Sequence, residues 1–225
     1  MIRLVLFDID GTLIRTGGAG VKAFARTFAT AFNVPDATRG LNFAGRTDPS
    51  LVRECFGSHD IDASAENFRR FFDAYVFWLH DLLSHCQGAA CAGVREFIGR
   101  LESLPQPPLL GLLTGNIRLG AEIKLRHYDL WDHFQSGAFG DDHEDRNQLA
   151  LIAQQRGSQL LRDNLSGDQI LVIGDTPLDI ACANAINAKM LAVATGGYSL
   201  EELNAHHPTW CVASLSGGNA AEFCL

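Results

Sequence analysis

Four short apolar runs are spaced along the chain, and each of them ends in a turn that contains glycine. They cover residues 2–9, 108–113, 169–173 and 189–194. The runs are apolar nearly throughout rather than alternating, as is typical of strands that are covered on both faces, and a helical pattern follows each one. Repeated strand–turn–helix units predict an α/β fold, a Rossmann-like three-layer structure around a parallel sheet.

The stretch between the first two runs has a helical period instead of a strand period. Apolar side chains form two stripes at this spacing: Val21, Phe24, Ala25, Phe28 and Phe32 in one, and Phe68, Phe71, Tyr75, Leu79 and Leu82 in the other. We therefore expect residues 16–87 to form an inserted α-helical cap domain, with glycine-rich hinges at both ends. The core domain then comprises residues 1–15 and 88–225.

Composition narrows the class of partner. The chain has 225 residues, of which 47% are hydrophobic, and a formal net charge of -8 without any dense run of lysine and arginine. These features are typical of a globular protein and argue against nucleic acid or a membrane surface as a partner. A small anionic substrate fits better, with a divalent cation to offset an acidic site. The amino-acid sequence does not indicate whether the protein is a monomer or a homodimer.

The six cysteines show no C-x-x-C pair and no zinc-like spacing. Unpaired thiols in a reducing compartment are the simplest interpretation, which predicts a cytoplasmic protein. The apolar start of the chain is too short for a signal sequence, and no run approaches the roughly 20 residues that span a bilayer.

Two aspartates, Asp8 and Asp10, follow the first apolar run in the segment DIDGTL. Ligands of open α/β sheets bind outside the carboxyl ends of the strands, so both residues are candidates for chemistry. An ionised carboxylate can act as a nucleophile, while a second one can protonate a leaving oxygen and later accept a proton from water. The structural alternative is a turn that is capped by aspartates.

Thr114, Gly115 and Asn116 follow the second apolar run, before a helix expected to begin near Ile117. A hydroxyl group and the backbone N–H groups of a helix start can hold a phosphate. The same three residues also make an ordinary helix cap.

Asp175 and Asp179 follow the third run in the segment GDTPLD. Pro177 is suited to the first turn of a helix, so Asp179 lies one turn inside it and both carboxylates can face one point. Oxygen ligands at that point suit Mg²⁺. The alternative is a solvent-facing pair that caps the helix.

In type and in order, these motifs resemble the haloacid dehalogenase superfamily, and within it the phosphoglycolate phosphatase-like and β-phosphoglucomutase-like group. DxDGT is the specific part, and the resemblance covers the whole chain. It implies a magnesium-dependent phosphatase that hydrolyses small phosphomonoesters, such as phosphoglycolate or sugar phosphates, through an aspartyl-phosphate. By resemblance, Asp8 is the nucleophile and Asp10 the acid/base, and both belong with Asp175 and Asp179 to the metal site.

The resemblance also implies Thr114 and the two residues after it as phosphate ligands. The Lys-Pro pair that is usual before the last motif is absent. The cation that balances the nucleophile is then either Arg146, at an expected helix start, or Lys124, in the helix after Thr114. In the cap, Arg46 is the candidate for contacting the leaving group, with an ordinary surface arginine as the alternative.

Other activities remain open on the same fold. A mutase of the β-phosphoglucomutase type would share every core residue. A dehalogenase has no need of an acid at Asp10, and a phosphonate hydrolase needs a cap lysine, whereas Lys22 lies close to the first hinge. A non-catalytic binding protein predicts no metal-dependent turnover.

Overall fold

The structure, a computed structural model, describes residues 1–216 and 218–224. Its centre is a six-stranded parallel sheet in the order β5-β4-β1-β6-β7-β8. The strands are β1 (Leu4–Phe7), β4 (Leu109–Leu113), β5 (Ser136–Ala138), β6 (Ile170–Gly174), β7 (Lys189–Val193) and β8 (Trp210–Val212). This confirms the predicted α/β class, and the four expected strands are β1, β4, β6 and β7.

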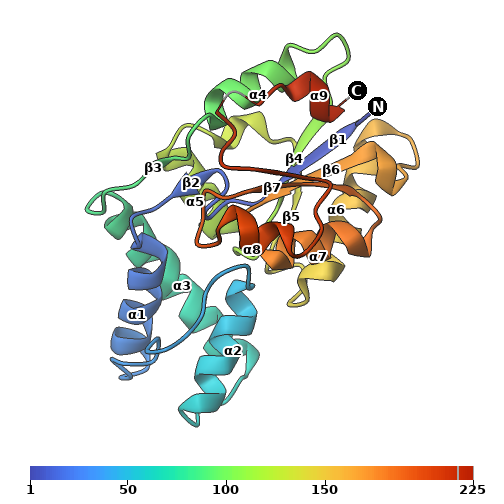
Figure 1. Ribbon diagram of the computed structural model, residues 1–225. Helices are drawn as coiled ribbons and strands as arrows, with labels where there is room; N and C mark the ends of the chain where they lie inside the picture. The colour runs from blue at the N-terminus through green and yellow to red at the C-terminus, as the bar shows by residue number, and fades with distance from the viewer. Residues whose placement is uncertain (217, 225) are drawn as a thin grey trace.

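Helices cover both faces of the sheet (Figure 1). One face carries α4 (Val94–Glu102), α5 (Arg118–His127) and α9 (Ala220–Cys224), and the other carries α6 (Arg146–Leu161), α7 (Pro177–Ala185) and α8 (Leu200–Asn204). The alternation of side chains along β1 explains its apolar sequence. Val5 and Phe7 pack under the first group of helices, while Leu4 and Leu6 pack under the second. The carboxyl end of β1 is therefore fixed from both sides.

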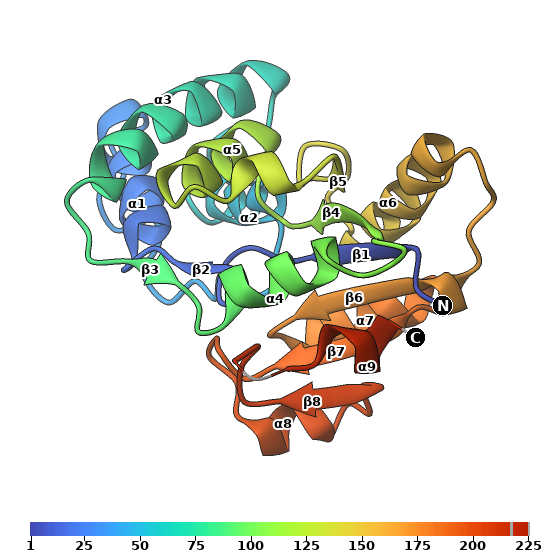
Figure 2. The ribbon, with the colours of Figure 1, turned by 90° about the horizontal axis from the view of Figure 1, so that it is seen from above.

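Three helices form a separate layer beside the sheet, α1 (Ala19–Ala31), α2 (Asp48–Ser58) and α3 (Ala65–Leu83), as Figures 1 and 2 show. Their interior is aromatic: Phe24, Phe28, Phe56 and Phe71 are at most 1% exposed. Their rings meet mainly edge to face, and the centroids of Phe28 and Phe71 are 4.8 Å apart. Val21 departs from the expected stripe, since it is 44% exposed.

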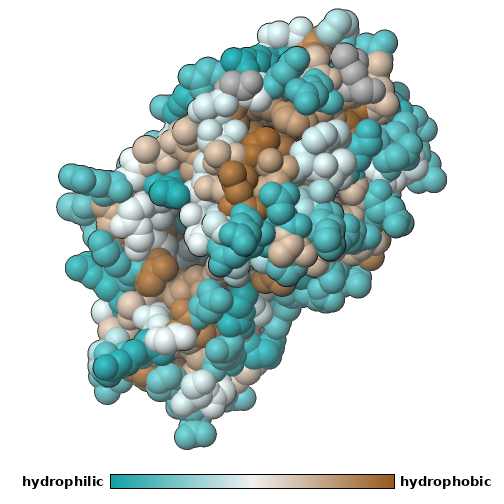
Figure 3. Space-filling view, viewed as in Figure 1, coloured by the Kyte–Doolittle hydropathy of each residue, from teal (hydrophilic) through white to brown (hydrophobic). Residues whose placement is uncertain are grey.

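A short antiparallel ribbon joins this helical cap to the core. β2 (Ile14–Arg15) pairs with β3 (Ala89–Ala90), so the outgoing and returning segments of the chain lie side by side. The predicted domain boundaries, after residues 15 and 87, fall next to this ribbon. The surface seen in Figure 3 is mostly hydrophilic, with apolar residues in separate patches over both parts.

Candidate active site

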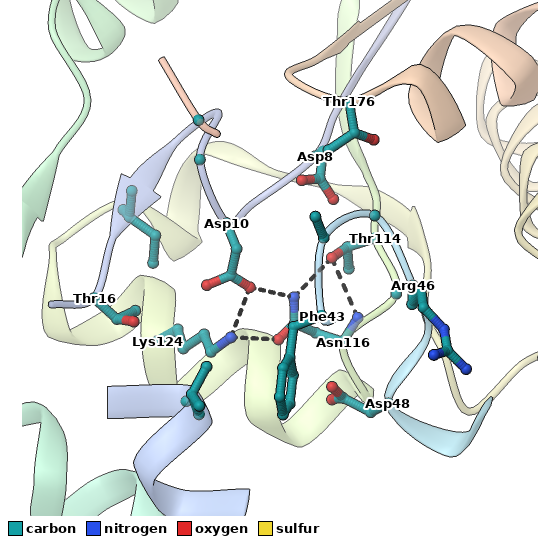
Figure 4. Close-up of a pocket in the computed structure, with 18 of the residues that line it drawn as sticks. Asp8, Asp10, Thr16, Phe43, Arg46, Asp48, Thr114, Asn116, Lys124 and Thr176 are labelled. Carbon is teal, nitrogen blue, oxygen red and sulfur yellow. Dashed lines mark hydrogen bonds and ion pairs between the residues drawn. The ribbon is translucent and has the colours of Figure 1, made fainter. Parts of the chain in front are cut away.

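The candidate residues converge on the carboxyl ends of three adjacent strands. Asp8 and Asp10 follow β1, Thr114 follows β4 and Asp175 follows β6. A cavity of about 450 Å³ lies between these strand ends and the cap, and all four residues line it. Figure 4 shows the carboxylates of Asp8 and Asp10 entering this cavity from the same loop.

Arg146 holds the first of these carboxylates. Its Nη2 donates to Asp8 Oδ1 at 2.7 Å and also to Asp179 Oδ1. All three side chains are at most 8% exposed, so this is a buried ion network with two carboxylates on one guanidinium. Burial opposes the charge of Arg146, but Asp179 and Asp8 outweigh it and raise the pKa of the guanidinium well above its ordinary value.

The positive charge of Arg146 does not fully offset the cost of burying the carboxylates of Asp8 and Asp175. Burial raises the pKa of Asp8 above its ordinary value, although Arg146 opposes the shift. Burial also raises the pKa of Asp175, and the nearby Asp179 and Asp8 add to it. One oxygen from each of Asp8, Asp175 and Asp179 lies within 4.8 Å of the others. A buried, oxygen-only, electron-rich cluster of this kind fits a hard divalent cation.

The three carboxylates are not equally available to a cation. Asp179 Oδ2 accepts from the backbone N–H of Thr176 at 3.0 Å and lies 2.7 Å from the Thr176 hydroxyl, while its Oδ1 accepts from Arg146. Asp175 Oδ1 accepts from the hydroxyl of Thr12 at 2.8 Å. Asp179 therefore has partners on both oxygens and orients Arg146, whereas Asp8 and Asp175 each have an oxygen for a metal.

The loop after β1 needs a glycine beside this cluster. Gly11 has φ of 90°, and a Cβ there would collide with the carboxylate of Asp175. The D-x-D-G-T spacing thus lets the β1 loop pass directly over the end of β6.

Lys124 serves the second aspartate. Its Nζ donates to Asp10 Oδ2 and to Asn116 Oδ1, both at 2.6 Å, and Asn116 Nδ2 donates to Asp10 Oδ2 at 2.8 Å. Figure 4 shows this triangle and its link to Thr114, whose Oγ1 accepts from Asn116. Because Thr114 Oγ1 accepts twice, its own proton remains available to point into the cavity.

The cap is connected to these groups through the segment before α2. Asp48 N donates to Gly115 O at 2.7 Å, and Ile117 N donates back to Asp48 Oδ2 at 2.9 Å. Arg146 Nη1 donates to Gly45 O at 3.1 Å. The same guanidinium thus contacts the nucleophile candidate and the cap backbone.

The structure brings together all the predicted core residues. Of the two candidate cations, Arg146 contacts Asp8 and Lys124 contacts Asp10. The assignment of Arg146 as the cation that balances the nucleophile stays a prediction, and its contact with Asp8 favours it. Arg46 lies apart from the core residues: its guanidinium pairs with Glu54 at 2.6 Å, and in Figure 4 it points away from Asp10. Its predicted contact with the leaving group stays a prediction.

The sequence indicated no separate role for Thr12 or Thr176, whereas Asp48 ends the stretch of residues 45–48 that was expected to contact the leaving group through Arg46. Thr12 is part of the D-x-D-G-T segment, so the sequence could have predicted that it lies in the site, but not that it contacts Asp175. Asp48 follows Arg46 closely in the segment that was expected to approach the substrate, but periodicity gives no sign that it is buried.

Residues 5–193 match the family model described as haloacid dehalogenase-like hydrolase. The match covers most of the chain. The protein therefore belongs to this family and is a hydrolase, which confirms the predicted family and enzyme class.

Individual relatives agree with this placement. A Clostridium perfringens protein named "Putative pyrophosphatase PpaX" is 25% identical over 218 residues, with 94% of this chain and 93% of that protein covered. Two solved structures share the fold. One, from Haemophilus somnus, is named a predicted phosphoglycolate phosphatase and has a TM-score of 0.72 at 16% identity, with 96% of this chain and 95% of that chain covered. The other, from Thermotoga maritima, is named a "putative beta-phosphoglucomutase" and has a TM-score of 0.64 at 20% identity, with both chains fully covered (100%).

Within residues 1–216 and 218–224, no helix combines the length and the apolar character needed to cross a membrane.

Proposed function

We propose that this hydrolase removes the phosphoryl group from small phosphomonoesters through an aspartyl-phosphate on Asp8. The observation that carries the proposal is the pairing of two differently held carboxylates at one cavity. Asp8 is buried against Arg146, whereas the side chain of Asp10 is 43% exposed and is held by Lys124. A nucleophile that is fixed and an acid/base that faces the substrate are what the two steps need.

In the first step, a carboxylate oxygen of Asp8 attacks phosphorus, and the bond from phosphorus to the leaving oxygen breaks. Asp10 gives that oxygen a proton, so an alcohol departs and the phosphoryl group remains on Asp8. In the second step, Asp10 accepts a proton from water as the water oxygen attacks phosphorus. The acyl phosphate bond then breaks, which releases inorganic phosphate and restores Asp8.

The phosphoryl oxygens would be held by groups at the end of β4. The Thr114 hydroxyl and the backbone N–H of Gly115 supply donors, while the N–H of Asn116 points to Thr114 Oγ1, and Arg146 supplies positive charge next to Asp8. These donors are fixed before substrate arrives, because Asn116 bonds Thr114 and Asp10 at once.

The proposal includes Mg²⁺, which Asp8, Asp175 and the backbone carbonyl of Asp10 would hold, with Asp179 in support. When bound, the ion offsets the negative charge of the carboxylates and of the phosphoryl group. We assign a small phosphorylated metabolite as the partner and the cytoplasm as the location. The curated relative named as a pyrophosphatase and the structure named as a phosphoglycolate phosphatase support phosphate chemistry.

The test is phosphate release from p-nitrophenyl phosphate with Mg²⁺ and with EDTA. We expect magnesium-dependent turnover that Asp8→Asn abolishes. Asp10→Asn should lower it about 10²- to 10⁴-fold, the usual contribution of a general acid or base. Asp73→Asn, on the exposed side of α3, is the matched control and should retain wild-type turnover.

Retained turnover in Asp8→Asn would overturn the covalent route. Transfer of phosphate between sugar hydroxyls without its release would favour a mutase, the activity named for the Thermotoga maritima structure.

A further inference from the structure

We propose that Asp48 and Tyr75 select the leaving group, and that the substrate is the phosphate ester of a sugar or another polyol. The inference rests on the phosphatase function proposed above and concerns the cap side of the same cavity. We expect leaving groups that carry a negative charge of their own to be poor substrates.

The cavity has two unlike ends. Its core end is lined by the aspartates and cations described above, while its cap end is lined by Phe24, Phe43 and Leu51. In the described part of the chain, three buried polar side chains of residues 16–87 line the cavity: Thr16 next to the β2–β3 ribbon, and Asp48 and Tyr75. A leaving group bound there is therefore mainly in apolar contact, with a few polar atoms to match.

Hydrogen bonds fix Asp48 in place, but they involve only one of its two carboxylate oxygens. Its Oδ2 accepts from Ile117 N at 2.9 Å, and its own N–H donates to Gly115 O at 2.7 Å. Oδ1 has no partner among the residues that the structure describes, although the side chain is buried, with the residue 8% exposed. This carboxylate oxygen is not among the atoms sealed without a partner, so it can accept a hydrogen bond from a ligand in the cavity.

Tyr75 presents a second unused group. The residue is 1% exposed, and its hydroxyl has no partner within residues 1–216 and 218–224. The hydroxyl is also absent from the oxygens and nitrogens that are sealed without a partner, so it opens on the cavity that Tyr75 lines. Together, Asp48 offers an acceptor and Tyr75 offers a group that can both donate and accept, which matches alcohol hydroxyls.

In the described part of the chain, the cap contributes one basic side chain to the cavity lining, Arg46, and Glu54 already pairs with it. Every basic side chain that lines the cavity already has partners: Arg146 has Asp8 and Asp179, Lys124 has Asp10 and Asn116, Arg46 has Glu54, and Arg15 has the carbonyls of Thr195 and Gly196. The group nearest to an anionic leaving group would be the carboxylate of Asp48, which repels it.

The experiment compares kcat/KM of the wild type for glycerol 3-phosphate, glucose 6-phosphate, phosphoglycolate, pyrophosphate and phosphoethanolamine. p-Nitrophenyl phosphate reports on the phosphatase chemistry alone. We expect kcat/KM for one of the two polyol esters to exceed the values for phosphoglycolate, pyrophosphate and phosphoethanolamine by about 10-fold or more, the scale of one hydrogen bond to a charged group. A preference for phosphoglycolate, pyrophosphate or phosphoethanolamine, with p-nitrophenyl phosphate turned over normally, would overturn the inference and leave the phosphatase intact. No turnover of any ester would overturn both.

Asp48→Asn tests whether Asp48 selects the leaving group or only connects the cap to the core through Ile117 and Gly115. An asparagine keeps an oxygen for Ile117 N but turns an amide N–H₂ toward the cavity. We expect the ratio of kcat/KM for the preferred polyol ester to that for phosphoglycolate to fall about 10-fold or more, and Tyr75→Phe to lower it about 2- to 10-fold. Asp73→Asn should leave the ratio unchanged. If Asp48→Asn lowers all substrates equally, Asp48 acts only in docking and the assignment fails.

Discussion

The sheet end of the cavity and the cap end are stabilised by different forces. At the sheet end, charged groups hold one another: Arg146 bridges Asp8 and Asp179 in a buried network, and the buried Lys124 bridges Asn116 and the partly exposed Asp10. In the cap, aromatic rings around Phe71 form the interior, and the polar connections to the core come from α2 and the segment before it.

This difference separates the two tasks of the site. Charge networks have strict geometry, so the sheet end keeps reacting groups in fixed positions. Apolar packing tolerates changes of shape better than a charge network tolerates the loss of a partner. The cap can therefore alter what it accepts while the chemistry stays unchanged.

The largest effect is expected from breaking the charge network at Arg146. Arg146→Ala leaves Asp8 and Asp179 buried without their cation, which should lower the free energy of unfolding by about 3–5 kcal/mol. Turnover should fall about 10²- to 10³-fold, because a charge beside the phosphoryl group is lost. Urea unfolding and p-nitrophenyl phosphate hydrolysis measure the two effects.

Arg146→Lys tests geometry at constant charge. One ammonium cannot serve Asp8, Asp179 and Gly45 O together, so we expect stability and turnover between those of the wild type and Arg146→Ala. Arg69→Ala, on the exposed surface of α3, is the control. Turnover of Arg146→Ala within about 3-fold of the wild type would contradict the role of Arg146 in offsetting phosphoryl charge.

Removing an aromatic side chain from the cap interior should destabilise the cap and leave the charge network at the sheet end in place. Phe71 is fully buried between Phe24 and Phe28, and Phe71→Ala is expected to cost about 3–5 kcal/mol. We expect amide hydrogen exchange to accelerate across α1 and α3 while β1 and β6 stay protected. Leu6→Ala is the matched change under the sheet. If both substitutions accelerate exchange equally throughout, cap and core unfold as one unit.

The smallest of these effects is a pH dependence at Asp48. Burial raises the pKa of this carboxyl from its ordinary value of 3.8 to about 6, against the attraction of Lys124. The folded state then binds the proton more tightly than the unfolded state. Wild-type stability should therefore fall, relative to Asp48→Asn, by up to about 3 kcal/mol as pH rises through this window, and remain constant above it. Urea unfolding of both proteins from pH 4 to pH 8 measures this, and a constant difference would contradict it.

Strong local signals explain what could be predicted. The doubly buried strands β1, β4, β6 and β7 have apolar runs, and polar residues at their ends mark the site. β5 and β8 lack such runs, since each has three residues at an edge of the sheet. Three residues are too few to show a hydrophobic pattern that distinguishes a strand from a loop.

Partnerships between side chains could not be predicted in the same way. Spacing left Arg146 and Lys124 as alternatives, because the choice depends on how α5 and α6 pack on the sheet. Tyr75 belongs to an apolar stripe, and periodicity says that it is buried without saying what its hydroxyl faces. The catalytic and metal-binding roles of the assembled residues stay predictions until the substitutions are made.

The ribbon of β2 and β3 has a consequence for how such a protein can change. Because the chain leaves the core at Arg15 and returns at Ala89 on the paired strand, the cap begins and ends at one place. A different insert whose ends meet there would leave the order of the six sheet strands untouched. We therefore expect the cap to be replaceable as a unit, so that new specificities can arise by exchanging it whole.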